Sequence, residues 1–359
     1  MTPPAQPDIA TAPESTSASQ LAALLQGTGI AQLDQTGWIR VTGEDRARWL
    51  NGMVTNSILP LQSGEGNYNF VLSVQGRIQG DATIFATPEA TPEAFLMETA
   101  SPRVPDLLAL LDRFIIMDDV ELADTTGTQS GLLVAGPKSA SFLAQIGLST
   151  ENLPSIAMRT ASWASADVTI IHAHSPLVPR FELWSDAETT SKLLEALHNA
   201  GAASCEPESL EWLRILEGTP LYGTDIRDRE LPHETAQTRA LHFAKGCYLG
   251  QEIVERIRSR GNVHRTFSAF RLDGNLPAAG TPLEADGKPV GELTSVAAIP
   301  IPGDNGTIAQ LALGYIRREA LDRHATLVYA GGVAVPVSLS FSTAAPSSQR
   351  PASESSERV

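Results

Sequence analysis

Apolar and polar residues are spaced along the chain in two patterns, one typical of strands and one typical of amphipathic helices. Residues 67–74 and 81–85 follow the two-residue period of a strand, and 37–41, 131–134 and 168–172 are short apolar runs bounded by turn residues. Apolar residues three and four positions apart, together with capping residues, predict helices that start after Thr42 and at 104–114, 138–146, 187–199 and 207–217. The pattern therefore predicts a mixed α and β architecture.

The pattern changes after Gly261. Short strand-like segments separated by Gly, Pro, Asp and Asn lie at 265–273, 281–284, 289–297, 308–316 and 325–340. Residues 303–306 are typical of a turn, and 330–332 of a tight hairpin. This many short strands in one segment predicts a small closed or half-closed barrel.

The two ends of the chain have a different composition. Residues 1–20 and 344–359 are rich in Pro, Ala, Ser and Thr without apolar periodicity, so we expect both to be disordered tails. The first twenty residues have neither a basic nor an apolar section of a secretory signal, and the chain has no apolar run of about 18 residues. We therefore expect a soluble cytoplasmic protein with no membrane partner.

Composition and charge narrow the function classes. Of 359 residues, 42% are hydrophobic and 19% charged, which excludes a wholly disordered protein. The formal net charge of −15 argues against a surface built to coat nucleic acid. Two cysteines, Cys205 and Cys247, are too few for a disulfide framework or a four-cysteine cluster, so we predict no resident metal site.

The segment from Lys245 to Glu252, KGCYLGQE, carries the strongest chemical signal. Gly246 and Gly250 free the backbone for a close approach, and a helix that opens here directs amide donors toward an anion. Cys247 lies near Lys245 and just before that helix, a setting that favours the thiolate form. The alternative is that Cys247 is a small buried residue that packs the loop, as we expect for Cys205.

This string, with HETA before it and RSRGNVHR after it, resembles the signature of the YgfZ family. Those folate-binding proteins are related to the aminomethyltransferase, or T-protein, of the glycine cleavage system. Further similar segments occur in the same order, namely GEDRARWLNGMVTN (43–56), GRIQGD (76–81), EGTPLYGTDI (217–226), LPHE (231–234) and VGELTS (290–295).

The resemblance implies an α+β fold of the T-protein type, in which two α/β subdomains and a C-terminal β-barrel surround a central cleft. It implies a folate-binding domain at 21–264, with a break between subdomains near 130, and a barrel domain at 265–343. It also implies tetrahydrofolate, or a one-carbon derivative, as cofactor. The family's usual role is to assist the assembly or maintenance of iron–sulfur proteins, and some members influence tRNA modification.

The resemblance also suggests individual site residues. Glu234 matches the family's Pro-x-Glu, and a carboxylate suits the two N–H donors of a pterin edge, although a solvated loop glutamate is the alternative. Asp81 corresponds to an acidic position near the folate in aminomethyltransferases, but the acid that precedes it there is replaced by Gly80. Asp81 could instead cap the next strand. The motif residues placed at the folate are Tyr248, Gln251 and Glu252.

Arg256, Arg258, Arg260, His264 and Arg265 form a basic stretch in this acidic chain. It could bind the glutamate tail of a folate, with Arg256 as the first contact, or an RNA or acidic protein. It could also be an ordinary helix face, since Glu252 and Arg256 are spaced to form an ion pair. No aromatic residues interleave these arginines, so we do not expect direct nucleic-acid binding.

His172 and His174 alternate on a predicted strand and point to one side, but no third ligand accompanies them. We therefore expect no metal there.

Three functions remain in competition. The first is a tetrahydrofolate-binding accessory factor with iron–sulfur enzymes or assembly proteins as clients. In this function Cys247 is the functional thiol and Lys245 stabilises its thiolate. Asp81 and Glu234 contact the pterin. The second is a folate-dependent aminomethyltransferase or demethylase that acts on a small amine. The third is a binding module without folate. No long apolar stripe remains outside the predicted core for a subunit interface, so we expect a monomer.

Overall fold

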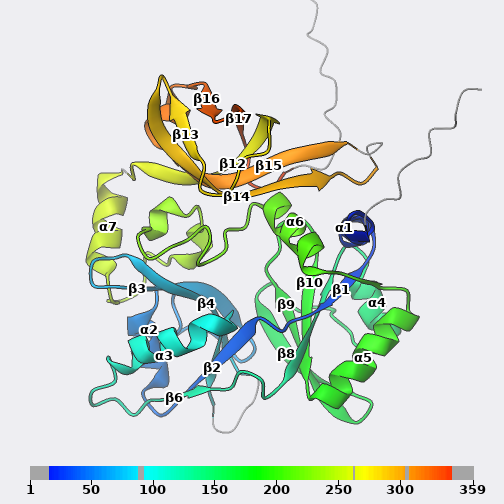
Figure 1. The fold of residues 1–359 in the computed structure, drawn as a ribbon. Coiled ribbons are helices and arrows are strands. Elements are labelled where there is room, and N and C mark those ends of the chain that lie inside the picture. The colour runs from blue at the N-terminus through cyan, green and yellow to red at the C-terminus, as the bar shows by residue number, and fades with distance from the viewer. Residues whose placement is uncertain (1–15, 88–92, 262, 304–306, 342–359) are drawn as a thin grey trace, which may run out of the picture.

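A computed structural model of the chain describes residues 16–87, 93–261, 263–303 and 307–341. Three parts meet around a common centre: two mixed α/β subdomains and a barrel (Figure 1). The predicted α+β class with a C-terminal barrel is therefore confirmed. No helix in the described ranges has the length and apolar content to cross a lipid bilayer.

The first subdomain is built on a five-stranded antiparallel sheet. In spatial order its strands are β3 (Gly66–Leu72), β4 (Ile78–Ala86), β5 (Phe95–Ala100), β2 (Thr36–Thr42) and β6 (Glu121–Asp124). Two helices, α2 (Arg46–Met53) and α3 (Val104–Asp112), supply apolar side chains to its core. The predicted cap at Thr42 is wrong: Thr42 ends β2, and Asp45 precedes α2 because Gly43, with φ of 99°, turns the chain between them.

The second subdomain has a six-stranded sheet. Its strands are β11 (Ala203–Ser204), β1 (Gly29–Gln32), β7 (Ser130–Ala135), β10 (Arg180–Ser185), β9 (Ala166–Ala173) and β8 (Ala157–Trp163). Its helices are α4 (Ser139–Gln145), α5 (Ala187–Asn199) and α6 (Pro207–Glu217). The chain passes from the first sheet to the second between Asp124 and Ser130, close to the predicted break. The N-terminal strand β1 nevertheless lies inside the second sheet, between β11 and β7.

The predicted N-terminal tail is wrong in its last five residues. Helix α1 spans Thr16–Gln26, and its buried Leu21 and Leu24 join a core cluster with Trp212 of α6. This tertiary contact stabilises a segment whose composition alone suggested disorder. Residues 1–15, and the predicted tail at 344–359, lie outside the described residues.

The barrel is closed by six antiparallel strands. In order they are β12 (Arg265–Gly274), β15 (Ile308–Arg317), β14 (Lys288–Pro300), β13 (Pro282–Ala285), β16 (Leu327–Tyr329) and β17 (Gly332–Val337). A short helix, α8 (Arg318–Asp322), follows β15, and the predicted hairpin joins β16 to β17. Part of the turn predicted at 303–306 lies outside the described residues.

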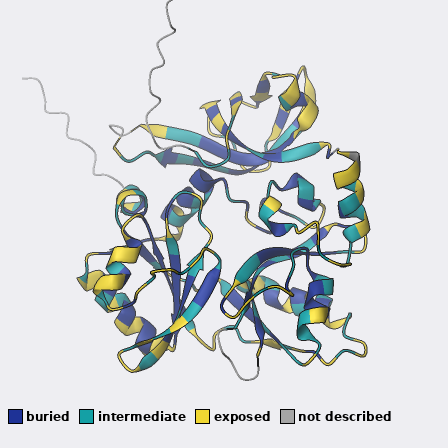
Figure 2. Cartoon of the chain, turned by 180° about the vertical axis from the view of Figure 1, so that it is seen from behind, coloured by how far each residue is buried: buried dark blue, intermediate teal, exposed yellow. Residues whose placement is uncertain are grey.

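A linking segment joins α6 to the barrel and lies against the first subdomain. It contains two 3-10 turns, η2 (Pro232–Glu234) and η3 (Thr238–Ala240), and helix α7 (Gln251–Arg260). Figure 2 shows that the strands of all three parts are largely buried, whereas the outer helices expose one face. The polar residues of the linking segment therefore meet strand residues near the centre of the molecule.

Candidate functional site

Asp81 lies at the centre of a polar cluster that we call the central cluster. Strand register places Tyr68, Thr83 and Glu98 side by side on β3, β4 and β5, and Asp81, two residues before Thr83, shares their face of the sheet. The Tyr68 hydroxyl donates a hydrogen bond to Asp81 Oδ2 at 2.6 Å, and the Arg239 guanidinium lies 4.1 Å from the centre of the Tyr68 ring. The predicted site residue Asp81 thus has ordered polar neighbours.

Residues from the other strands and from the linking segment complete the central cluster. Arg103 lies over the Tyr222 ring and is close enough to influence the pKa of Asp81. Glu98 interacts with Glu182, a fully buried residue of β10 that accepts a hydrogen bond from Arg180 at 3.1 Å. The cluster therefore joins both subdomain sheets through facing carboxylates.

The protein around the central cluster changes the protonation of its members. Burial raises the pKa of Asp81, and burial together with the Glu182 carboxylate raises the pKa of Glu98 well above its ordinary value. Partial burial, reinforced by nearby Arg239, lowers the pKa of His174 to about 4. His174 is nevertheless exposed, and Asp81 and Arg239 are only half-buried, so solvent reaches the groups at this junction.

Several buried donors near the central cluster have no hydrogen-bond partner. They are Nε of Arg103, Nε and Nη2 of Arg227, and the hydroxyl of Tyr315. Arg103 is close enough to influence the pKa of Asp81, and Tyr315 is close enough to influence the pKa values of Tyr68 and Arg227. Buried polar groups are normally satisfied, and a set of unsatisfied donors beside accessible carboxylates is typical of a site that holds a polar ligand.

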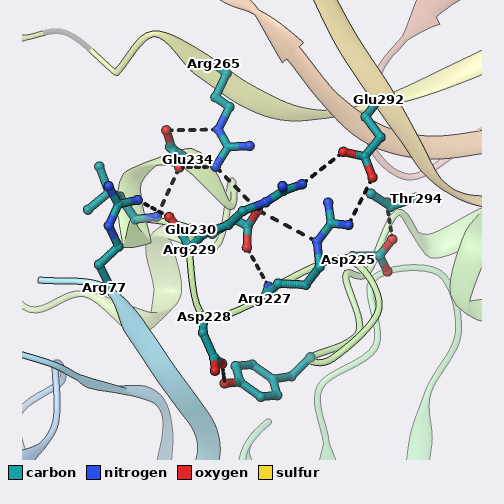
Figure 3. Close-up of polar contacts among 12 residues, drawn as sticks. Arg77, Asp225, Arg227, Asp228, Arg229, Glu230, Glu234, Arg265, Glu292 and Thr294 are labelled. Atoms are coloured by element: carbon teal, nitrogen blue, oxygen red, sulfur yellow. Dashed lines mark hydrogen bonds and ion pairs between the residues drawn. The ribbon is translucent and has the colours of Figure 1, made fainter. Parts of the chain in front are cut away.

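Next to the central cluster, an arginine–glutamate network connects the linking segment to the barrel (Figure 3). Glu230 is fully buried, accepts the Arg227 backbone N–H at 2.7 Å and pairs with Arg229 at 3.1 Å. Glu292 of β14 pairs with the same two arginines, at 3.0 Å from Arg227 and 2.9 Å from Arg229. The network fixes the segment around residue 230 against the barrel.

Glu234 belongs to this network, which does not support its predicted role at a pterin. Arg265 of β12 donates to both carboxylate oxygens, at 3.2 and 3.1 Å, and the Leu231 N–H also donates to Oε2. The side chain is buried, with both oxygens bound, in the arrangement that Figure 3 shows. Glu234 therefore holds η2 to the barrel, and Arg265 is an ion-pair partner rather than part of an open basic patch.

Lys245 does not stabilise a Cys247 thiolate as we predicted. Its ammonium donates to three backbone carbonyls at the C-terminal end of α2 and just beyond it, those of Asn51, Val54 and Asn56, at 2.6, 2.7 and 2.6 Å. These contacts use all three N–H donors and complement the helix dipole. Burial lowers the pKa of Lys245 to about 7. Lys245 therefore anchors the motif loop to the first subdomain.

The two motif glycines differ in their surroundings. Gly250 has φ of 80°, and a Cβ there would lie 2.6 Å from the Ser73 carbonyl oxygen and 3.1 Å from the Cα of Gly76. The predicted close approach is confirmed for Gly250, which meets the turn before β4, the strand that carries Asp81. A Cβ at Gly246 would meet no atom within 4 Å, so the same prediction is wrong there.

We expect Gly250→Ala to destabilise the fold by about 2 kcal/mol or more, since it adds left-handed backbone strain to a steric clash. Gly246→Ala is the matched control in the same loop and should change the free energy of unfolding by less than about 0.5 kcal/mol. Urea unfolding of the two variants measures the difference. Equal losses would show that the contact between Gly250 and the Ser73 turn is unimportant.

The other motif residues divide between surface and core. Cys247 is exposed, whereas Cys205 is buried, as predicted, and burial raises its pKa to about 11. Tyr248 packs in one core cluster with Tyr68 and Tyr222, so its ring contributes to the apolar packing of these two tyrosines of the central cluster. Gln251 accepts the Tyr248 N–H at 3.3 Å, a local contact at the start of α7.

Of the basic stretch, Arg265 pairs with Glu234, Arg256 and Arg258 are exposed, and the side chain of Arg260 lies outside what the structure describes. The expected Glu252–Arg256 ion pair is not formed, and α7 instead pairs Glu255 with Arg258 at 3.2 Å. Glu252 and Arg256 are exposed. His172 hydrogen-bonds the Leu153 carbonyl and does not pair with His174. Within the described ranges, no group of three or more His, Cys, Asp or Glu side chains is placed to hold a metal ion.

Sequence reasoning missed most of the central cluster, namely Tyr68, Glu98, Arg103, Glu182, Arg227, Arg239 and Tyr315. One signal was available, because Glu98 and Glu182 are charged residues inside strongly apolar strands. The arginines carried no such signal, since they reach the cluster from separate turns and loops.

Comparisons with known proteins agree with this architecture. Residues 10–245 match the family model of the GCVT N-terminal domain, and residues 267–343 match that of the CAF17 C-terminal beta-barrel domain. An aminomethyltransferase of Nostoc is 24% identical over 78% of this chain and 76% of its own. A putative chloroplastic transferase of Arabidopsis thaliana is 26% identical over 82% and 66%. The crystal structure of the glycine cleavage system aminomethyltransferase T from Bartonella henselae superposes with a TM-score of 0.79, at 18% identity, over 91% of this chain and 90% of that one.

Proposed function

Because this chain belongs to the family of the GCVT N-terminal domain, we propose that it binds a reduced folate at the central cluster and assists iron–sulfur proteins. The barrel match to CAF17 and the KGCYLGQE string favour the YgfZ branch of this fold over an ordinary aminomethyltransferase. The observation that carries the proposal is the accessible Asp81 carboxylate together with Arg103, whose Nε has no hydrogen-bond partner and whose charge influences the pKa of Asp81.

The residues of the central cluster fit the chemistry of tetrahydrofolate. The pterin ring presents N–H donors that a carboxylate such as that of Asp81 can accept, and a carbonyl oxygen that an arginine can meet. The rings of Tyr68 and Tyr222 border these groups, and Arg239 and Arg103 lie over their faces. The reduced folate would carry any one-carbon unit, while the protein binds and orients it.

Calorimetric titration of the full chain with tetrahydrofolate tests the binding step. We expect one site per chain. A chain that is correctly folded by circular dichroism but gives no heat would exclude both folate hypotheses and favour the binding module without folate.

Cys247 is the residue that we assign to contact with iron–sulfur clients. Its thiol is exposed on a loop that Lys245 and Gly250 hold in place, so a client or assembly protein can reach it. We expect Cys247→Ser to leave tetrahydrofolate binding unchanged but to reduce the rescue of iron–sulfur enzyme activity in a deletion strain at least tenfold. Cys205→Ser, at the buried cysteine, is the control for general loss of a thiol. Full rescue by Cys247→Ser would exclude a role for this thiol.

Aminomethyl transfer is the second candidate, and one observation favours it. The acid that is replaced by Gly80 would not face the central cluster, because a Cβ at Gly80 points into α3, 2.5 Å from Leu107. The loss of that acid therefore leaves Asp81 in place as a group that can act on a folate. Formation of 5,10-methylenetetrahydrofolate from an amine donor by the purified protein would establish this activity, and binding without turnover would favour the accessory role.

A further inference from the structure

A loop on the first subdomain exposes two large apolar side chains side by side. Ile116 is 83% exposed and Met117 is 94% exposed, between the end of α3 and the start of β6. We call these two residues the apolar tip. Figure 1 places β6 on the rim of the molecule opposite the barrel, so this surface is remote from the central cluster. A pair of fully exposed large apolar residues is unusual unless a partner covers it.

The apolar tip leads into an open sheet edge. Strand β6 (Glu121–Asp124) is the last strand of the first sheet and pairs only with β2. Among the described residues, no backbone group outside the sheet bonds to the main chain of 121–124. On the side away from β2, alternate N–H and C=O groups are therefore available to another strand.

A groove runs beside this edge. It has a volume of about 660 Å³, and apolar side chains including Ile115, Val120 and Leu122 line it together with the carboxylates of Asp112 and Glu121 and the guanidinium of Arg40. Neither carboxylate forms an ion pair within the described ranges. The groove thus offers apolar contacts and two carboxylates against one guanidinium, next to backbone hydrogen-bonding groups.

The charge of this surface distinguishes between two occupants. The residues on β6 and near it in the sequence or the sheet are more often acidic than basic. The acidic residues are Asp112, Asp118, Asp119, Glu121 and Asp124, and the basic residues are Arg40, Arg48 and Arg113. A second copy that pairs its own β6 antiparallel would place Glu121 opposite Asp124, in a chain whose net charge is already −15. Like charges directly opposite each other destabilise strand pairing. A basic partner strand can form the same hydrogen bonds with this edge without the repulsion between carboxylates.

We propose that β6 and the apolar tip bind an extended basic segment of a partner protein, which adds a strand to the first sheet. Main-chain hydrogen bonds to β6 provide affinity. Apolar residues at alternate positions of the segment cover Ile116, Met117 and the groove. Lysine or arginine residues between them pair with Glu121, which points to the opposite face of β6 from Leu122. This surface is independent of the folate site.

The test uses a fluorescein-labelled hexapeptide of alternating arginine and valine, titrated with the full chain by fluorescence anisotropy. We expect the double variant Ile116→Ser/Met117→Ser to bind at least tenfold more weakly, since it removes two apolar contacts. Ile308→Ser is the matched control, because Ile308 is a large aliphatic residue, 63% exposed, on the barrel. Hydrogen exchange at residues 121–124 should slow when the peptide binds.

Three results would overturn the proposal. One is no binding of the peptide by the unaltered chain. Another is equal binding of the double variant, or of a hexapeptide with glutamate in place of arginine. The third is dimerisation of the chain in sedimentation velocity that Ile116→Ser/Met117→Ser abolishes, which would identify the occupant as a second copy.

Discussion

Replacing Asp81 by asparagine is expected to weaken tetrahydrofolate binding about 100-fold, the loss typical of a charged hydrogen-bond acceptor. The substitution preserves shape but removes the charge that pterin donors and Arg239 would meet. Titration calorimetry measures the change, and Asp322→Asn on the exposed surface of α8 is the control. An affinity within threefold of the unaltered chain would place the folate elsewhere.

The pH dependence provides a second readout of the same group. Because burial raises the pKa of Asp81, its carboxylate is lost on acidification at a higher pH than an ordinary aspartate would be. Protonation turns an acceptor oxygen into a donor. We therefore expect the affinity for tetrahydrofolate to fall as the pH is lowered toward the raised pKa, with a weaker dependence in the Asp81→Asn variant.

Replacing Glu230 by glutamine is expected to destabilise the protein by about 3 kcal/mol. Glu230 is 0% exposed and forms ion pairs with Arg229 at 3.1 Å and Arg265 at 3.4 Å. Removing one partner of a buried ion-pair network leaves uncompensated charge, and this cost exceeds that of an exposed pair. Thermal or urea unfolding of the variant measures the loss.

Glu292→Gln is the matched control, since Glu292 pairs with Arg227 and Arg229 but its side chain is 32% exposed. Solvent screens this pair, so its loss should cost less than about 1 kcal/mol. Equal losses for both variants would mean that burial does not determine the strength of this network.

The sequence predicted the elements whose stability is local or strongly periodic. Helix α5 begins after Asp186, whose carboxylate caps it by accepting the Thr189 N–H at 2.9 Å, and α6 has the predicted bounds. The barrel strands alternate clearly enough to be placed within a few residues. Asp81 was singled out because GRIQGD (76–81) resembles the acidic stretch of the aminomethyltransferases, and its role at a folate stays a prediction.

The wrong predictions share a physical cause. Each of these side chains or segments contacts residues that are far away in the sequence. Lys245 bonds carbonyls about 190 positions earlier, and Glu234 pairs with an arginine 31 positions later. No local pattern distinguishes a lysine that anchors a helix end from one that activates a thiol. Helix α1 was missed for the same reason, because its stability depends on α6.

The position of β1 has a consequence for how the protein is made. This strand, formed by residues 29–32, pairs with β7 on one side and β11 on the other, so the second sheet needs residues 203–204 before it is complete. During synthesis, the ribosome releases β1 and β7 long before β11. Strand β1 therefore waits with one edge unpaired, and chaperones that bind exposed strands have time to reach it.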